Sequence, residues 1–418
     1  AGEYQGVAMK VGWEVKTLGD IVDVKGGKRV PKGYKLQSEP TKHPYITVSD
    51  FTDDGTIDTS NIRYVSSEVF DQIKRYTISS NNLYLSIAGT IGKTGYVPSE
   101  LDGASLTENA CKLVLRPGID RDFIYYFTKS DDFARQAGTN TRIAAQPKLA
   151  LERLKTIKLP IPSSLPEQQR IVGLLDEAFE GIATATANAE KNLKNARALF
   201  ESHLQSVFTQ RGLGWEEKLL GDVCEFENGD RGKNYPHRSE YVESGIPWIN
   251  TGHIQRDGTL SETEMNFISR EKYESLRSGK IQPGDLVYCL RGATLGKTAL
   301  VDPLTEGAVA SSLVILRPSS VLDSRYLYSF LTSPLGQGLI KGYENGAAQP
   351  NLGAKSVAKY PISFPPIAEQ KQLVAKLDDL HEETQRLESI YQQKLAALNA
   401  LKKSLLHQAF NGELTGGN

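Results

Sequence analysis

Two glycine-rich motifs in the chain have the residue types that could bind a phosphate group. Gly92-Lys93-Thr94 and Gly296-Lys297-Thr298 each place a lysine and a threonine directly after a glycine. They resemble the end of a nucleotide-binding loop, whose backbone N–H groups and lysine surround the phosphates. The first glycine of such a loop is missing, since Ile87 and Arg291 stand there, and a β-like run follows where a helix should begin. The sequence therefore favours a glycine-rich turn between two strands.

A search for other catalytic or metal-binding residues gives a negative result. Neither G-x-S-x-G nor H-E-x-x-H occurs, and the Asp/Asn-Pro-Pro-Tyr/Phe tetrapeptide of amino-methylating enzymes is also missing. The histidines do not cluster, and Cys111, Cys224 and Cys289 are too far apart for a C-x-x-C metal site. His203 falls on a predicted helical seam, where a packing role is expected. We therefore predict that the chain catalyses no reaction itself and binds no metal.

The chain repeats itself with a period of about 202 residues. Five motifs return in the same order, at offsets of 201 to 204: W-E-x-K-x-L-G-D at 13–20 and 215–222, G-K-T at 92–94 and 296–298, L-R-P at 115–117 and 316–318, A-A-Q-P at 144–147 and 347–350, and E-Q at 167–168 and 369–370. The full length of 418 residues is too long for one ordinary domain. Two related halves are therefore expected.

Each half consists of a β-rich part followed by a long helix. Runs rich in Val, Ile, Tyr and Thr predict strands at 45–48, 82–87, 112–115, 248–251, 285–290 and 313–316. Short helices are predicted at 121–129 and 324–331. A proline cluster ends each β-rich part, and the runs 167–208 and 369–410 that follow contain no proline. The predicted fold is two α/β (α+β) modules in tandem, each followed by one long helix.

Both long helices carry a coiled-coil seam, in which residues recur at alternating spacings of three and four. The seam from Leu373 to Leu405 is rich in leucine, and the seam from Ile171 to His203 is rich in alanine. Large residues that face small ones let two helices interdigitate, so we pair the two helices of this chain with each other. An antiparallel pair, with helices roughly 60 Å long, would place one module at each end and return Phe410 to the first module.

The composition is that of an ordinary folded protein, with 39% hydrophobic and 24% charged residues. The formal net charge of −1 argues against a strongly basic protein that binds nucleic acid unaided. No apolar stretch approaches the roughly 18 residues of a membrane span, and no apolar signal sequence opens the chain. We expect a cytoplasmic protein, and the dispersed cysteines fit a reducing compartment.

Local basic clusters nevertheless lie on loops beside glycines. Such residues suit contacts with phosphates and with guanine edges. The candidate DNA-binding residues are Lys25, Lys28, Arg29, Thr90, Lys93, Thr94, Arg142 and Gln146 in the first half, and Arg231, Lys233, Arg291, Thr294, Lys297, Thr298 and Gln349 in the second. Segments 28–43 and 230–246 are among those that differ between the halves, as expected for one scaffold with two reading surfaces.

Taken in order, these motifs resemble the specificity (S) subunit of type I restriction–modification systems. The resemblance covers nearly the whole chain. It rests on the repeated motifs above, on Asn351-Leu352 after the second A-A-Q-P, on the proline-rich approach to each Glu-Gln pair, and on Phe410-Asn411-Gly412-Glu413-Leu414. One local departure is Lys148-Leu149, which stands in the first half where the pattern has Asn-Leu.

The resemblance implies that each module is a target recognition domain that reads one half of a bipartite, asymmetric site in double-stranded DNA. The helical pair would set the spacer between the half-sites and bind two modification (methyltransferase) subunits, with restriction subunits as further partners. The modification subunits would bind S-adenosylmethionine and methylate adenine N6, while this chain would bind no cofactor. The candidate partner-binding residues are Glu167, Gln168, Glu369 and Gln370.

The predicted domains are a first target recognition domain at 10–165, a central helical spacer at 166–210, a second target recognition domain at 211–365 and a C-terminal helical spacer at 366–412. Two alternatives stay open. One is a coiled-coil scaffold that reads no DNA sequence, and the other is a nucleotide-dependent enzyme that uses the Gly-Lys-Thr turns. The subunit of a methyltransferase-only system is a variant of the favoured function, from which the sequence does not separate it.

Overall fold

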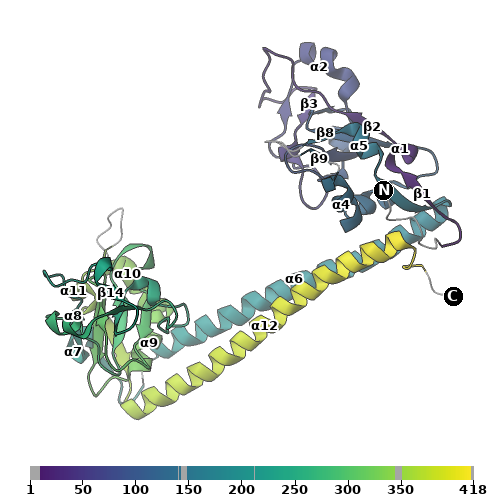
Figure 1. Ribbon diagram of the computed structural model, residues 1–418. Coiled ribbons are helices and arrows are strands. Elements are labelled where there is room, and N and C mark those ends of the chain that lie inside the picture. Colours follow the sequence, from purple (N-terminus) through teal and green to yellow (C-terminus); the bar gives the residue numbers. More distant parts are fainter. Residues whose placement is uncertain (1–9, 140, 143–147, 211, 344–350, 416–418) are drawn as a thin grey trace. The chain divides into compact units, whose positions relative to one another are not determined.

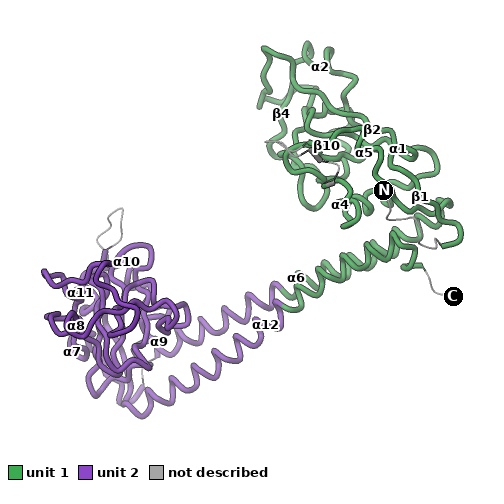
Figure 2. The backbone as a smooth tube through the Cα atoms, in the orientation of Figure 1, with its two compact units in different colours: residues 1–189, 393–418 green, residues 190–392 purple. Residues whose placement is uncertain are grey.

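The computed structural model of the chain describes residues 10–139, 141–142, 148–210, 212–343 and 351–415. The chain forms two compact units (Figure 2). Unit 1 comprises residues 1–189 and 393–418, and unit 2 comprises residues 190–392. Each unit contains one β-rich module and a segment of each long helix, so the chain passes twice between the units.

Module 1, the β-rich part of unit 1, is built on a four-stranded antiparallel sheet. Its strands lie in the order β2 (Val22–Gly26), β8 (Ala110–Leu115), β5 (Leu83–Ser86) and β6 (Thr94–Tyr96). A second sheet has the order β4 (Arg63–Tyr64), β3 (Pro44–Ile46) and β7 (Ser105–Leu106). Two strand pairs complete the module: β1 (Trp13–Thr17) with β11 (Lys158–Pro162), and β9 (Thr141–Arg142) with β10 (Lys148–Leu149).

The helices of module 1 are short: α1 (Leu18–Ile21), α2 (Ser67–Ile73), α3 (Arg121–Thr128), α4 (Asp131–Thr139) and α5 (Leu151–Lys155). The α3 helix begins after Asp120, whose carboxylate accepts hydrogen bonds from the N–H groups of Asp122 and Phe123, both at 2.9 Å. This N-cap satisfies two donors that the helix itself cannot pair. The buried face of α3 then joins the main core of the unit through Phe123 and Phe127.

Module 2, the β-rich part of unit 2, repeats this topology. Its main sheet has the order β13 (Cys224–Asn228), β20 (Leu313–Pro318), β17 (Leu286–Cys289) and β18 (Thr298–Leu300). Its second sheet has the order β14 (Tyr241–Val242), β16 (Asn266–Ile268), β15 (Ile246–Ile249) and β19 (Ala308–Val309), and β12 (Glu216–Leu219) pairs with β21 (Pro361–Phe364). The matching strand orders confirm the predicted repeat.

The short helices of module 2 are α7 (Leu220–Val223), α8 (Arg270–Ser275), α9 (Ser324–Thr332), α10 (Pro334–Tyr343) and α11 (Ala354–Val357). The α9 helix corresponds to α3 and has the same N-cap, since the Asp323 carboxylate accepts from the N–H groups of Arg325 and Tyr326. Both helices lie where the sequence pattern predicted them, as do the central strands of both main sheets. Sequence patterns were informative here because the two helices are amphipathic and the central strands are short apolar runs, which are buried at every position in β5 and β17.

The two long helices are α6 (Leu165–Thr209) and α12 (Ile367–Asn411), of 45 residues each (Figure 1). In unit 1, Leu175 near the start of α6 shares a core with Phe410 at the end of α12, and Trp13 packs against that core. In unit 2, Phe208 at the end of α6 shares a core with Leu377 near the start of α12. The helices of one chain therefore pair antiparallel in each unit, as predicted.

The predicted seam is wrong by one residue near the C-terminal end of each long helix. Leu199 and Leu401 are 65% and 47% exposed, and His203 is also exposed, whereas Leu204 and Leu406 are buried in the cores. A straight α-helix has about 3.6 residues per turn, so a strict heptad pattern drifts by roughly 20° per heptad relative to the buried face. His203 therefore does not have the packing role that its sequence position suggested.

The three cysteines are buried and none forms a disulfide. Within the described ranges, no helix is long and apolar enough to cross a membrane. The same residues contain no group of three or more His, Cys, Asp or Glu side chains that could hold a metal ion.

Candidate nucleic-acid interface

The Gly-Lys-Thr motif forms the same turn in both modules, between β5 and β6 and between β17 and β18. Gly89 and Gly92 have φ angles of 74° and 95°, and Gly292 and Gly296 have φ angles of 77° and 82°. These left-handed conformations favour glycine because a Cβ atom would be strained there. A strand follows each motif directly, which is the turn that the sequence favoured over a nucleotide-binding loop.

The threonines that end these motifs are structural. Thr94 is fully buried, and its hydroxyl donates to the carbonyl of Tyr84 at 2.7 Å. Thr298 is 4% exposed, and its hydroxyl donates to the carbonyl of Gly296 at 3.0 Å. Both threonines were predicted to contact DNA, but a buried hydroxyl that already bonds the backbone does not present itself to a ligand. We therefore leave both out of the candidate interface.

Two other threonines lie within the turns. Thr90 is exposed, and its carbonyl accepts a hydrogen bond from the hydroxyl of Ser86 at 2.5 Å. Thr294 is half-buried, with its hydroxyl oxygen 3.3 Å from the sulfur of Cys289. Thr90 thus keeps its hydroxyl available to a ligand, whereas Thr294 turns its hydroxyl towards the interior of the turn.

The two motif lysines are anchored in the same way. The Lys93 Nζ donates to the carbonyl of Phe51 at 3.2 Å, and the Lys297 Nζ donates to the carbonyl of Ile254 at 3.4 Å. Only Lys93 has an acidic partner in the described residues, because its Nζ lies 2.7 Å from a carboxylate oxygen of Asp53. The hydrogen bond and charge of Lys93 hold the pKa of Asp53 below its ordinary value.

Several cations of module 1 lie on and beside β2, and we call this group the β2 basic surface. It consists of Lys25, Lys28, Arg29, Lys112 and Lys148. Lys25 stands opposite Lys112 in the β2–β8 register. The Lys28 Nζ lies 5.7 Å from the ring centroid of Tyr76, a distance typical of a cation–π contact. Three of these residues were predicted from the sequence, and all but Lys112 are exposed.

Lys112 and Lys148 are additions that the sequence alone did not suggest. The Lys112 Nζ donates to the carbonyl of Thr77, and both burial and the nearby charge of Lys25 lower the pKa of Lys112. The Lys148 Nζ donates to the carbonyl of Glu108 at 3.4 Å. The alternation of β8 could have indicated that Lys112 lies on the face opposite to Cys111 and Leu113, but only strand pairing brings it opposite Lys25.

Arg29 is partly neutralised at the edge of this surface. Its Nε lies 2.5 Å from a carboxylate oxygen of Glu108, although the Arg29 side chain is 78% exposed. Partial burial acts to raise the pKa of Glu108, but the hydrogen bonds from Arg29, its own backbone and Thr107 hold that pKa below its ordinary value. Glu108 is therefore ionised at neutral pH and competes with any anion for Arg29.

The equivalent place in module 2 carries a different set of charges. Glu227 and Asp230 stand where module 1 has Lys25 and Lys28. The Glu227 carboxylate accepts from the N–H of Gly279 at 2.6 Å, and the Asp230 carboxylate accepts from the N–H of Arg277 at 2.9 Å. The acidic side chains therefore hold the 277–280 loop against the sheet, and two carboxylates stand here where module 1 has two lysines.

Arg231 retains the position of Arg29 but has a neutral partner. Its guanidinium donates to the carbonyl of Ser311 at 3.2 Å. Lys233 and Arg291 are exposed, and Arg291 pairs through its backbone with Asn351. Among the predicted residues of module 2, these three and Lys297 remain as candidates. Gln146 and Gln349 lie outside the described residues, and Arg142 is described only as part of β9.

The glutamines predicted to bind a partner are buried instead. The side-chain carbonyl of Gln168 accepts from the N–H of Asp120 at 2.8 Å, and its amide donates to the carbonyls of Gly118 and Pro162. Gln168 is 1% exposed, so it fastens the start of α6 to the N-cap of α3 and is not available to a partner.

Gln370 repeats this arrangement in module 2. Its side chain accepts from the N–H of Asp323 at 2.8 Å and donates to the carbonyls of Val321 and Pro365, both at 2.8 Å. The preceding glutamates differ from these glutamines, because Glu369 is exposed and Glu167 pairs with Arg170 at 3.4 Å on the helix surface. Only the glutamates remain candidates for partner contacts.

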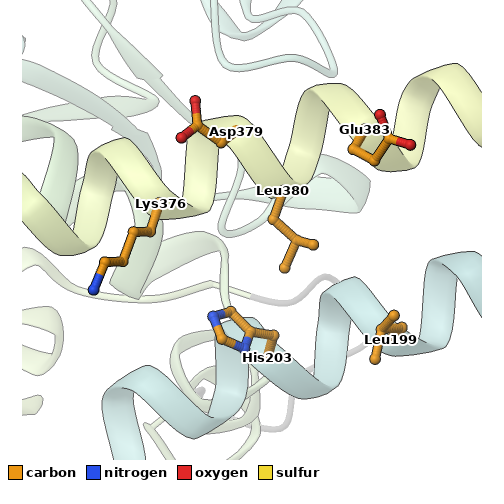
Figure 3. Close-up of a pocket in the computed structure, with 6 residues that line it drawn as sticks. All are labelled: Leu199, His203, Lys376, Asp379, Leu380 and Glu383. Atoms are coloured by element: carbon orange, nitrogen blue, oxygen red, sulfur yellow. The ribbon is translucent and has the colours of Figure 1, made fainter.

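A groove between the long helices lies in unit 2 (Figure 3). It is lined by Leu199 and His203 of α6 and by Lys376, Asp379, Leu380 and Glu383 of α12. The side chains of Leu380 and His203 point into the space between the helices (Figure 3).

Comparison with protein families identifies a repeated domain. The family described as "Type I restriction modification DNA specificity domain" matches residues 10–195 and again residues 213–397. The chain is 22% identical to the type I restriction enzyme EcoKI specificity subunit of Escherichia coli K12, over 97% of this chain and 89% of that protein. It is also 22% identical to the MjaIX specificity subunit of Methanocaldococcus jannaschii, over 96% and 93% of the two chains.

Solved structures share the fold along nearly the whole chain. One chain, from work on the complex assembly and conformational transition of a type I R-M system, has a TM-score of 0.77 at 19% identity. That match covers 97% of this chain and 99% of the other. The HsdS subunit from Thermoanaerobacter tengcongensis has a TM-score of 0.63 at 21% identity, over 97% and 98% of the two chains.

Proposed function

Because the chain belongs to the type I restriction modification DNA specificity domain family and carries its domain twice, we propose that it reads a bipartite DNA site, one half with each module. Specificity subunits are the non-catalytic members of these systems, in agreement with the negative search for catalytic motifs. The chain thus supplies recognition, and other subunits supply the chemistry.

The observation that carries this proposal is the contrast between a shared scaffold and different surface charges. Both modules have the same strand order in the main sheet and the same Gly-Lys-Thr turn. At equivalent positions, however, Lys25 and Lys28 of module 1 become Glu227 and Asp230 of module 2. Two readers with one fold and unlike surfaces suit an asymmetric site whose halves have different sequences.

The partners in this proposal are double-stranded DNA and two modification subunits, with restriction subunits as further members of the complex. Leu199 and Leu401 support two equivalent binding surfaces, because both are exposed and lie 202 positions apart in the repeat. In unit 2, Leu199 borders the groove that Lys376 and Glu383 also line. One modification subunit would bind to each surface through these leucines and the neighbouring charges.

The modification subunits would bind S-adenosylmethionine and methylate adenine N6 in each half-site, while this chain would bind no cofactor. The complex would act in the cytoplasm, where bacterial and archaeal DNA is found. The helical pair would set the spacer, so removing seven residues from each helix should shorten the spacer and leave the half-sites unchanged. A change in the half-site sequences would contradict that role.

The deciding experiment maps methylated adenines in DNA from cells that carry this chain together with its modification subunit. A bipartite motif with a spacer of fixed length is expected. A scaffold without sequence reading would give no motif. Binding of nucleotide to the purified chain would instead support an enzyme that uses the Gly-Lys-Thr turns, which the strands β6 and β18 directly after those turns disfavour.

A further inference from the structure

A surface pocket in module 2 lies between the loop after β15 and the Gly-Lys-Thr turn. Its lining includes Ile254, Gln255, Arg256, Asp257, Glu264 and Lys297. The pocket thus combines cationic donors, carboxylate acceptors and an amide that can do both. A phosphate would be met by donors alone, whereas the edge of a base pair presents donors and acceptors side by side.

The loop that carries these residues is held in one conformation. The N–H of Gln255 donates to the carbonyl of Thr259 at 2.9 Å, and the Asp257 carboxylate accepts from the N–H and hydroxyl of Thr259 at 3.0 and 2.7 Å. Gly258 has a φ of 81°, and a Cβ there would lie 2.1 Å from the Tyr328 hydroxyl oxygen of α9. A loop fastened in this way can present its side chains without a large cost in entropy.

The two cations of the pocket have no carboxylate partner within the described chain. Arg256 is exposed and forms no ion pair or side-chain hydrogen bond with those residues. Asp257 follows it directly, but that carboxylate is occupied by Thr259, whose hydroxyl and N–H hydrogen bonds lower the pKa of Asp257. Lys297 donates only to the carbonyl of Ile254. Both cations are therefore available to a ligand.

Module 1 has the same backbone hydrogen bond here, with one charge reversed. The N–H of Thr52 donates to the carbonyl of Thr56 at 3.0 Å, as Gln255 does to Thr259. Asp53 occupies the position of Arg256, and its carboxylate lies 2.7 Å from the Nζ of Lys93. The lysine that module 2 leaves available is thus paired within module 1.

From this difference we infer that the pocket of module 2 reads the edge of a base pair, and that the equivalent place in module 1 does not. The inference rests on the proposed function. Arg256 and Lys297 supply the donors that guanine O6 and N7 accept, and Glu264 supplies an acceptor for the cytosine N4 amino group. The ligand is therefore a G·C pair in the half-site of module 2.

The test exchanges the charges of the two modules in the full chain, with its modification subunit, and maps methylated adenines. Arg256→Asp recreates the arrangement of module 1, so one position in one half-site should lose roughly tenfold of its base preference. Asp53→Arg should change the preference only in the other half-site. Arg256→Gln keeps the length and polarity of the side chain, and its thermal unfolding, with that of Arg256→Asp, shows whether the fold is intact.

The outcomes separate this inference from the proposed function. If the unsubstituted chain directs methylation to no bipartite motif, the proposed function fails. If it gives such a motif but folded Arg256→Asp changes neither half, or weakens methylation equally at all sequences, the pocket does not read a base. Changes in the same half for Arg256→Asp and Asp53→Arg would also overturn the inference.

Discussion

Modules 1 and 2 have the same residues where two backbone segments come into close contact. They differ in the charged side chains around those contacts. Gly27 and Gly229 occupy equivalent positions after β2 and β13. A Cβ would lie 2.0 Å from the carbonyl oxygen of Thr107 at Gly27 and 2.5 Å from that of Ala310 at Gly229. Such distances exclude any other residue, so glycine stands at both positions although the side chains around it have changed.

The interiors of the main sheets also differ in charge. Module 2 contains a buried ion pair, in which Arg317 donates to both carboxylate oxygens of Asp285 at 2.9 Å. Asp285 is fully buried. In the strand register the equivalent positions of module 1 hold Asn82 and Val114, so the L-R-P repeat, which aligned Arg317 with Arg116, is displaced by two residues from the paired strands. Both modules share one hydrogen bond within a turn. Asp285 accepts it from the N–H of Gln282 in module 2, and Asn82 accepts it from the N–H of Ser79 in module 1. Module 2 thus adds the charge of Asp285 and its partner Arg317, although module 1 forms the same hydrogen bond with the neutral Asn82.

Removal of Arg317 should have the largest effect on stability. Arg317→Ala leaves the buried Asp285 carboxylate without its partner, at a cost of about 3–5 kcal/mol in the free energy of unfolding of unit 2. Val114→Ala, the matched change in module 1, should cost about 1 kcal/mol in unit 1. Hydrogen exchange resolved by residue would measure the two units separately.

A double variant tests whether module 2 stays stable when its Asp285–Arg317 ion pair is replaced by the neutral residues of module 1. Asp285→Asn with Arg317→Val transplants the neutral arrangement and keeps the turn bond to Gln282. Most of the stability lost in Arg317→Ala should return, because no buried charge remains. A double variant as unstable as the single one would mean that the two sheets are not equivalent at this position.

The buried glutamines should show the opposite result, namely equal effects in both modules. Gln168→Ala and Gln370→Ala each leave one N–H and two carbonyl groups without partners at a helix start. The expected loss is about 1–3 kcal/mol in the free energy of unfolding. Gln169→Ala and Gln372→Ala change exposed glutamines nearby and should cost less than about 0.5 kcal/mol. Unequal losses of stability for Gln168→Ala and Gln370→Ala would show that the two modules are attached to their long helices by hydrogen bonds of different strength.

The repeat, the long helices and the central strands could be predicted because they leave periodic signals. The predicted seam follows the buried face in the first half of α6 and of α12. It then drifts away from that face, since its members Asn192, Leu199, Lys394 and Leu401 are exposed. Local spacing does not record this drift, since the heptad pattern alone continues through these residues. The domain boundaries proposed from the prolines stay a prediction.

The candidate site was predicted less well, because residue type does not indicate where a side chain points. Thr94 and Thr298 follow a lysine in a motif typical of phosphate binding, yet both are buried at the first position of a strand. Gln168 and Gln370 lie in the first turns of the long helices, but each side-chain amide forms hydrogen bonds with backbone groups of the module that precedes its helix. Lys112 joins the β2 basic surface only through strand pairing. Each outcome depends on tertiary contacts between segments that are distant in sequence.

The β2 basic surface should contribute to DNA binding without regard to sequence. Lys28→Ala should weaken binding by the assembled complex about threefold at moderate salt and flatten the salt dependence by about one counterion. Asp230→Ala, at the equivalent position of module 2, removes a carboxylate and should not flatten that dependence. Titrations of DNA at several salt concentrations measure both slopes. An unchanged slope for Lys28→Ala would exclude this lysine from the interface.

The smallest expected effect concerns the partners of Arg29 and Arg231. Glu108→Gln should strengthen DNA binding about twofold, because Arg29 is released from a carboxylate that lies at the protein surface. Ser311→Glu places a carboxylate beside Arg231, as in module 1, and should weaken binding by a similar factor. Opposite changes of similar size would show that both arginines face DNA and that Glu108 moderates only the first. If Glu108→Gln instead weakened binding, the carboxylate would be needed to orient Arg29, and the two arginines would have different roles despite their equivalent positions.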